Sequence, residues 1–231
     1  MFQANLTEEQ RLSKAVVAIM GKRKYMAMAG VLMIGDRSIT DDPNIPTACT
    51  NGRDEMYSRT FVSKLSDPEL RFLVLHEVYH KLYKHLITWQ ALHKEDANKA
   101  NIACDYVINI KLFDDNKDDK FATMTGELSK GCLDEKYRGM NSAEVYKLLG
   151  DSPPPPPPPP EGYGYTNGGV GQVTNEQDQG QGQGQPLDIH DWDGAKELTS
   201  EEKRELERDL DEAIRQGAMV AGKLGTGGDR E

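Results

Sequence analysis

The sequence is poor in the features that mark a secreted or membrane-bound protein. It has three cysteines, Cys49, Cys104 and Cys132, which is an odd number without CxxC spacing. This suits a reducing cytosol better than a disulfide framework. The first residues lack a basic segment followed by an apolar run, and no apolar stretch reaches the length of about 20 residues that a membrane span needs. We therefore predict a cytoplasmic protein without a signal peptide or a membrane partner.

Basic residues are scattered and outnumbered, with 28 lysines and arginines against 38 acidic residues and a formal net charge of −10. The one basic cluster, residues 22–24, is short enough to be an ordinary helix end. Binding to phosphate needs clustered Lys and Arg, so we expect no nucleic-acid partner and no anionic membrane surface. With 231 residues, the chain can form one domain with a real core, plus appendages.

The most informative feature present is the segment His76-Glu77-Val78-Tyr79-His80, an HExxH motif within an apolar helical stretch. Positions i and i+4 of a helix share one face, so both imidazoles can bind the same metal ion. The glutamate between them is then held beside the metal, where it can take a proton from a bound water. This arrangement is the working core of a zinc peptidase.

The residues around the motif favour a buried helix. Ser66 and Glu69 form a predicted capping box with Pro68 in the first turn, and apolar residues then surround a continuous helix that we predict from Ser66 to Trp89. Burying two histidines and a glutamate is costly unless each has a partner, and a metal supplies one. The alternative is a pair of core histidines bonded to carbonyls, with the glutamate in a salt bridge.

A catalytic zinc needs a third protein ligand. His85 comes nine residues after His76, which would place it on the far side of a continuous helix, so we exclude it. The metzincin pattern needs a histidine at position 86, where the sequence has Leu86. His93 and the pair Glu95–Asp96 fall in the predicted turn after the helix and are expected to be solvated.

Asp105 is the better candidate for the third ligand. It lies in a second predicted helix, Asn98–Phe113, on a polar stripe that also contains Asn101 and Asn109. A metal-binding aspartate fits this stripe, with an amide one turn to each side that orients the ligands. The alternative is that Asp105 caps the helix or pairs with a surface lysine such as Lys111.

Several of these segments together resemble a known family. They are Lys64–Arg71 leading into His76–His80, then Asn101–Asn109, with weaker likeness at Ile45–Gly52 and Gly139–Tyr146. They resemble the HExxH metallopeptidase domain family of bacteria and phages, over roughly Leu12 to Leu149. In many bacterial members a VWA-like domain follows. This chain resembles the family without that part, which we expect of a phage-encoded member acting in the host cytoplasm.

The resemblance implies a set of site residues, named by their positions here. His76, His80 and Asp105 would be the ligands of a Zn²⁺ ion, and Glu77 would be the catalytic base. For oxyanion stabilisation the sequence offers only unranked candidates, which are Tyr79, Tyr83, Tyr106 and His190.

The predicted fold is α+β and zincin-like, mainly helical, with a small antiparallel sheet above the HExxH helix. A capping box at Thr7 opens a helix to about Gly21, and a strand is predicted from Val31 to Ile39. Residues 47–57 form a predicted hairpin, because Asn51-Gly52 favours a type I′ turn. The edge strand of this sheet either pairs with extended substrate or is purely structural.

The composition changes sharply after a short helix predicted at Ala143–Leu149. Pro153–Pro160 is an unbroken proline run, predicted to form a polyproline II rod that acts as a spacer or binds a protein partner. Glu161–Pro186 is rich in Gly, Gln and Asn, which favours a disordered insert. We therefore divide the chain into a metallopeptidase domain (1–150), a linker (151–186) and a C-terminal part (187–231).

The C-terminal part has two features. Leu187–Trp192 contains His190 and Trp192, which either fold over the active site, with His190 binding the oxyanion, or anchor the last helix. That helix, from Ser200 to about Gly222, is highly charged with a narrow apolar stripe, and it either docks on the core or mediates self-association.

Three functions are consistent with the sequence. The first is a zinc-dependent metallopeptidase that hydrolyses peptide or protein substrates, with Glu77 as general base and His190 as a second catalytic residue. The second is a catalytically silent zinc-containing interaction or regulatory protein. The third is a helical binding protein without a metal.

Overall fold

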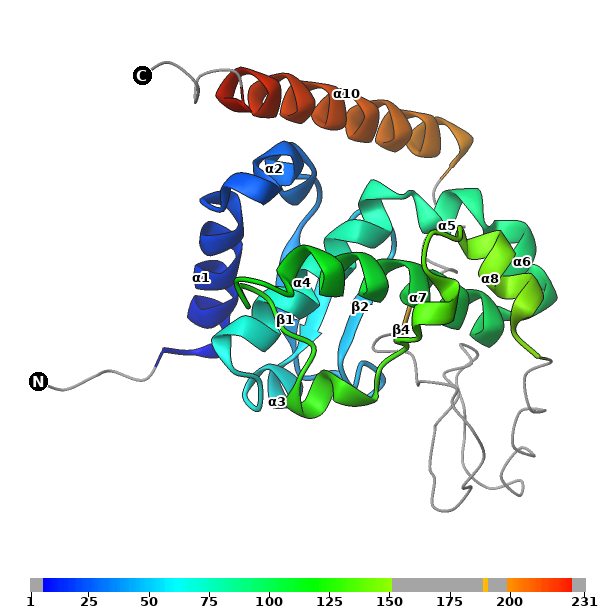
Figure 1. Ribbon diagram of the computed structural model, residues 1–231, viewed down its shortest axis with the longest axis horizontal. Coiled ribbons are helices and arrows are strands. Elements are labelled where there is room, and N and C mark those ends of the chain that lie inside the picture. Colours follow the sequence, from blue (N-terminus) through cyan, green and yellow to red (C-terminus); the bar gives the residue numbers. More distant parts are fainter. Residues whose placement is uncertain (1–5, 151–188, 191–198, 226–231) are drawn as a thin grey trace, which may run out of the picture.

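The computed structural model of the protein describes residues 6–150, 189–190 and 199–225, and for 189–190 and 224–225 it describes the backbone alone (Figure 1). The predicted linker, 151–186, lies outside the described residues. So does Trp192. In the described part, no helix is both long enough and apolar enough to cross a membrane.

The N-terminal helices are partly as predicted. Helix α1 spans Glu8–Met20 and begins at the predicted cap, where the side chain of Thr7 accepts a hydrogen bond from the Gln10 backbone. The 3-10 helix η1 (Arg23–Met28) and helix α2 (Ala29–Leu32) follow. The strand predicted from Val31 is therefore wrong at its start, because Val31 is buried in α2 and the strand begins only at Arg37.

The sheet contains four short strands in the order β1-β3-β2-β4, namely β1 Arg37–Thr40, β2 Ala48–Thr50, β3 Glu55–Ser58 and β4 Ile189–His190. Strands β2 and β3 form the predicted antiparallel hairpin. However, β1 is parallel to β3 and β4 is parallel to β2. The prediction of an antiparallel sheet is thus wrong, because the link after β1 is long enough to place β2 on the far side of β3. The α+β class is confirmed at the level of a helical protein with a small mixed sheet.

The turn between β2 and β3 differs from the predicted type I′ turn. That type needs positive φ at both central residues. In the turn only Gly52 has one (φ 90°), while Asn51 does not. The Asn51 side-chain oxygen instead accepts hydrogen bonds from the backbone of Arg53 and Asp54, at 2.9 and 2.7 Å. An asparagine side chain that bonds its own loop closes the hairpin.

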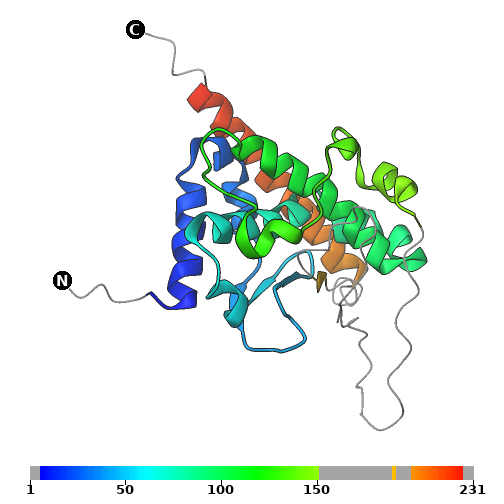
Figure 2. The ribbon, with the colours of Figure 1, turned by 60° about the horizontal axis from the view of Figure 1, so that its bottom comes forward.

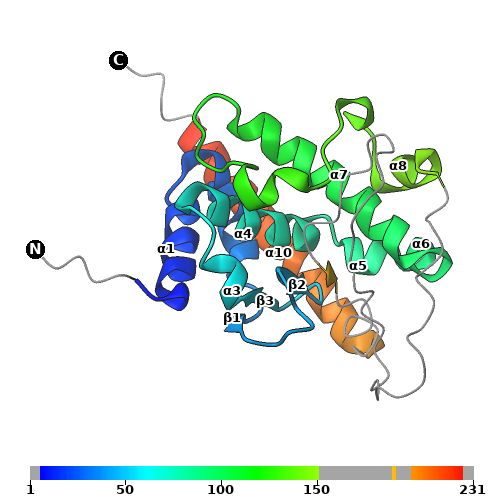
Figure 3. The same ribbon diagram turned by 90° about the horizontal axis from the view of Figure 1, so that it is seen from below.

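Helix α4 (Asp67–Leu82) carries the HExxH motif and lies between the sheet and helix α7 (Ala97–Asn116), as Figures 2 and 3 show. Its N-terminus has the predicted cap, since the Glu69 carboxylate accepts hydrogen bonds from both the backbone and the hydroxyl of Ser66. Short helix α3 (Arg59–Val62) connects the sheet to it.

The prediction of one continuous helix to Trp89 is wrong. Helix α4 ends at Leu82, and Lys84 takes a left-handed conformation (φ 52°, ψ 38°). Two short helices follow, α5 (His85–Thr88) and α6 (Gln90–Glu95). Helix α7 in turn runs past Phe113, the predicted end of that helix, because the buried Asn116 side chain donates to the carbonyl of Leu112 and the hydroxyl of Tyr25.

After α7 the chain forms η2 (Gly126–Lys130), η3 (Glu135–Tyr137) and α8 (Ser142–Leu148), the last capped by Asn141. The main core lies between α1, α4, the sheet and the last helix. A second apolar cluster lies between α7 and α8.

The last helix, α10 (Ser200–Gly225), docks on the core of the same chain and lies across α2 in Figure 1. Its stripe residues Leu206 and Leu210 are buried. Gly30 and Gly217 allow α10 to approach α2 and η1 closely. An added Cβ at Gly30 would be 3.0 Å from Ala213, and one at Gly217 would be 1.8 Å from the carbonyl oxygen of Ala27. In the structure, this helix takes the first of its two predicted roles, which is docking on the core.

Gly217→Ala should therefore separate α10 from η1. We expect it to lower the free energy of unfolding by about 1–3 kcal/mol, as overpacking against a rigid neighbour does. The measurement is urea unfolding followed by circular dichroism. Gly222→Ala in the same helix is the control, because its Cβ would meet no atom within 4 Å. It should be neutral or stabilising by up to about 1 kcal/mol through helix propensity. Equal effects of both substitutions would contradict the close packing.

Candidate metal centre

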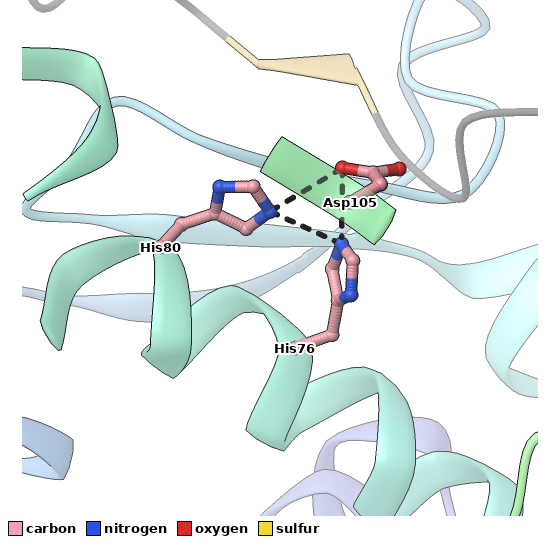
Figure 4. Close-up of side chains that lie close together, drawn as sticks. All are labelled: His76, His80 and Asp105. Atoms are coloured by element: carbon pink, nitrogen blue, oxygen red, sulfur yellow. Dashed lines mark hydrogen bonds and ion pairs between the residues drawn. The ribbon is translucent and has the colours of Figure 1, made fainter. Parts of the chain in front are cut away.

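Helices α4 and α7 bring His76, His80 and Asp105 together (Figure 4). The two imidazole Nε2 atoms are 3.1 Å apart. The Asp105 Oδ1 atom is 3.6 Å from the Nε2 of His76 and 3.5 Å from the Nε2 of His80. All three side chains are fully buried. The structure thus unites the three residues that the sequence analysis selected as ligands.

These distances fit a bound metal ion. Zinc binds imidazole nitrogen and carboxylate oxygen at about 2.0–2.2 Å, so tetrahedral ligand atoms are roughly 3.3–3.6 Å apart. The three separations between the donor atoms lie close to that range. Two nitrogens and one oxygen are also a donor set that zinc accepts. The residues present therefore fit the ion that the sequence analysis predicts.

The contacts in the structure differ from the alternative roles predicted for Asp105 and for the two histidines. Lys111 pairs with Asp115, with Nζ 2.5 Å from Oδ1, and Asp105 lies inside α7 rather than at its end. The histidine ring nitrogens contact other side chains. A helix cap, a surface ion pair and carbonyl-bonded histidines therefore do not describe these contacts.

Asn109 orients His76 from one turn further along α7. Its side-chain nitrogen donates to the carbonyl of Cys132 at 3.1 Å, which leaves its oxygen to accept from His76 Nδ1 at 2.8 Å. A proton on Nδ1 leaves the lone pair of His76 Nε2 directed at the cluster. Asn101, on the same predicted stripe, is only half-buried.

His85, which we excluded from the site, lies beside it. Because α4 ends before it, the chain turns back at Lys84 and places His85 Nδ1 3.1 Å from His80 Nδ1. On its other side, His85 Nε2 is 3.4 Å from the hydroxyl of Ser142 in α8. Its exposed fraction is 2%. The only sequence signal was a third histidine within ten residues of the motif.

Glu77 is fully buried in α4, where it lies between the two histidines in the sequence, and its charge acts on Tyr57 of the sheet. Burial raises the pKa of the Tyr57 hydroxyl well above its ordinary value, and the charges of Glu55 and then Glu77 add to the increase.

A buried ion cluster that the sequence analysis missed joins this sheet to α4. Glu55 of β3 is bonded by three groups, with Arg37 Nε at 2.6 Å, Lys81 Nζ at 2.5 Å and the Tyr57 hydroxyl at 2.6 Å. Burial alone would raise the pKa of the Glu55 carboxyl, but Lys81 and Arg37 outweigh it and hold that pKa below its usual range. Lys81 comes one turn after Glu77, so the cluster fixes the motif helix against the sheet.

The candidate oxyanion residues fall in different places. The Tyr79 hydroxyl lies 3.4 Å from Asp115, which is ten residues beyond Asp105, or about 15 Å along the helix. The Tyr106 ring packs on Tyr137, with ring centroids 4.6 Å apart.

Tyr83 is closer to the site, with its ring centroid 5.4 Å from that of His85. For His190, the backbone pairs with Thr50 in the sheet, and the side chain is outside the described part.

A comparison with known proteins places these observations in a family. The sequence matches the family described as "Putative metallopeptidase domain" over residues 7–227. No curated protein and no solved structure matches the chain. The match extends beyond the predicted Leu12–Leu149 and includes α10. Its name agrees with a metal-dependent peptidase at the level of the class. With nearly its whole length matched, the chain belongs to this metallopeptidase domain family.

Proposed function

We propose that the protein is a zinc-dependent metallopeptidase. His76, His80 and Asp105 would hold the ion, and Glu77 would act as general base. The observation that carries this proposal is the convergence of three buried donor atoms at separations of 3.1, 3.5 and 3.6 Å beside a buried glutamate. Zinc bound there would polarise the scissile carbonyl and lower the pKa of a bound water.

The chain's own groups would carry the proton. Glu77 takes it from the attacking water and passes it to the leaving amine, which a carboxylate can do from a fixed position between the two ligands. Asn109 keeps His76 in the tautomer that presents its lone pair to the ion. His190 stays a prediction as oxyanion donor, because only its backbone is described.

The sheet edge next to the motif helix bears on substrate binding. The sequence left two roles open for the edge strand of the sheet, which either pairs with extended substrate or is purely structural. In the structure both hairpin strands are already paired on their outer sides, β3 with β1 and β2 with β4. A peptide that pairs with a hairpin strand would have to displace β1 or β4, whereas one that adds to the sheet would pair with the outer edge of β1 or β4.

Metal content is the direct test of the proposed site. We expect the protein to retain close to one equivalent of zinc after dialysis, measured by plasma mass spectrometry, because three donors are preassembled. At a free zinc concentration 100 times Kd, binding should raise the free energy of unfolding by about 2.7 kcal/mol. Asp105→Ala should lose most of the zinc, whereas His93→Ala, outside the group of three, should keep it. A folded wild-type protein without zinc would overturn the proposal.

Burial favours a second candidate, a zinc-containing interaction protein without catalysis. The three donors and Glu77 are all fully buried, and a structural site has no position open to water. Zinc at one equivalent together with no hydrolysis across a peptide library would support it. A protein partner would then bind through the proline run, which is outside the described residues, or the exposed face of α10, which includes Met219 and Val220.

A further inference from the structure

We infer that His85 is a positioning residue of the metal site, and that with Ser142 it holds His80 in the tautomer whose Nε2 atom binds the ion. This inference rests on the proposed metal site. It adds a residue outside the HExxH motif and outside the group of three donors.

The first support is the backbone that brings His85 back to the motif. Helix α4 ends at Leu82, and Lys84 takes the left-handed conformation, with φ 52°. Non-glycine residues rarely take this conformation, and such residues cluster at functional sites. The Lys84 ammonium is held by Asp211 of α10, with Nζ 2.7 Å from Oδ1. Without this turn, His85 would follow the helix away from His80.

The second support is the order of donors and acceptors. His80 directs Nε2 to the other two ligands and Nδ1 to His85 Nδ1, at 3.1 Å. Two ring nitrogens at this distance need one proton between them. When His80 Nε2 binds a metal, the proton of the neutral ring is on Nδ1, so His80 donates and His85 accepts.

The same order then continues to α8. With Nδ1 as acceptor, a neutral His85 has its proton on Nε2, which donates to the Ser142 hydroxyl at 3.4 Å. Ser142 is itself buried at the start of α8. A chain of two hydrogen bonds thus runs from His80 through His85 to Ser142. It matches the chain from His76 through Asn109 to the Cys132 carbonyl.

Each histidine ligand is therefore oriented through its Nδ1 atom by a different part of the fold. Outer partners of this kind change metal affinity by about 10–100-fold when they are removed. His85 does not replace a ligand, because its Nδ1 atom faces the Nδ1 of His80 rather than the donor cluster.

The test measures tautomers and zinc affinity in the full chain. In protein labelled with ¹⁵N at histidine, long-range ¹H–¹⁵N spectra of the zinc-loaded form should show His80 protonated at Nδ1 and His85 protonated at Nε2. Competition with a chromophoric chelator should show a loss of zinc affinity of about 10–100-fold in His85→Leu. His85→Asn should recover most of it, because its amide oxygen can accept the His80 proton. His93→Leu is the matched control and should leave affinity unchanged.

The outcomes separate this inference from the proposed function. A wild-type protein that binds no zinc overturns the metal site itself. A wild-type protein that binds zinc, with equal affinity in His85→Leu, overturns only the role of His85. If His85→Leu does not fold, the unmodified protein still decides, because His85 protonated at Nδ1 in the zinc-loaded form would contradict the proposed chain.

Discussion

Glu77→Gln is expected to keep its zinc and to lose peptide hydrolysis by about two to four orders of magnitude. This is the contribution usually made by one general base. Glutamine has nearly the shape of glutamate, so the fully buried position can accommodate it. Its amide cannot take a proton from water. The proposed ligands His76, His80 and Asp105 are untouched, so metal content should not change.

The measurement is kcat/KM on a peptide cleaved by the wild-type protein, found by mass spectrometry of a peptide library, with zinc content measured on the same samples. Glu135→Gln is the control, because that side chain is 84% exposed and distant in sequence from the motif. Full turnover in Glu77→Gln would refute Glu77 as base. No turnover in zinc-loaded wild type would instead favour the silent interaction protein.

Glu55→Gln should have the largest effect on stability, with a loss of about 3–5 kcal/mol in the free energy of unfolding. Removing one member of a buried ion cluster leaves the others uncompensated. Here the remaining members are Lys81 and Arg37, whose distances to Glu55 are 2.5 and 2.6 Å, and the side chains of Glu55 and Lys81 are fully buried. A neutral amide cannot balance two cations. Urea unfolding at neutral pH measures the difference.

The control is an ion pair of similar length on the surface. Lys14 Nζ lies 2.6 Å from Asp67, with the two side chains 56% and 43% exposed. Lys14→Gln should cost at most about 1 kcal/mol, because exposed pairs contribute little. If Glu55→Gln and Lys14→Gln lowered the free energy of unfolding equally, burial of the ion cluster would not be the cause of the loss.

The same carboxyl predicts a pH dependence with a definite sign. Folding lowers the pKa of Glu55 below its ordinary value of 4.5. Its contribution to stability is therefore complete above pH 4.5 and is lost as the pH falls through the lower pKa of the folded state. The unfolding free energy of Glu55→Gln should change less than that of the wild type over this acidic range.

The sequence predicted those parts of the site whose pattern lies within a single helix. The HExxH spacing and the stripe of Asp105 and Asn109 are helical periodicities, so the helices alone place these side chains. The turn at Lys84 has no such signal. A lysine has no preference for a left-handed conformation, and tertiary contacts impose it. For this reason His85 was predicted on the far side of a helix that in fact ends at Leu82.

The buried ion cluster was unpredictable for a similar reason. Arg37, Glu55 and Lys81 are far apart in the sequence, and charged residues are usually solvated. Only the pairing of β1 with β3 and the packing of α4 bring them together. The pairing itself is parallel, and parallel strands are joined by longer connections that leave no short-range pattern.

The docking of α10 has a consequence for how the protein is made. Its partners η1 and α2 leave the ribosome early, whereas α10 is synthesised some 170 residues later. Until then the apolar surface around Ala27 and Gly30 has no cover from this helix. The helices that contain the three proposed donors are complete by Asn116, well before α10 is synthesised. Closure of the core waits for a contact of high sequence separation, which is slow to form and prone to aggregation in the interval.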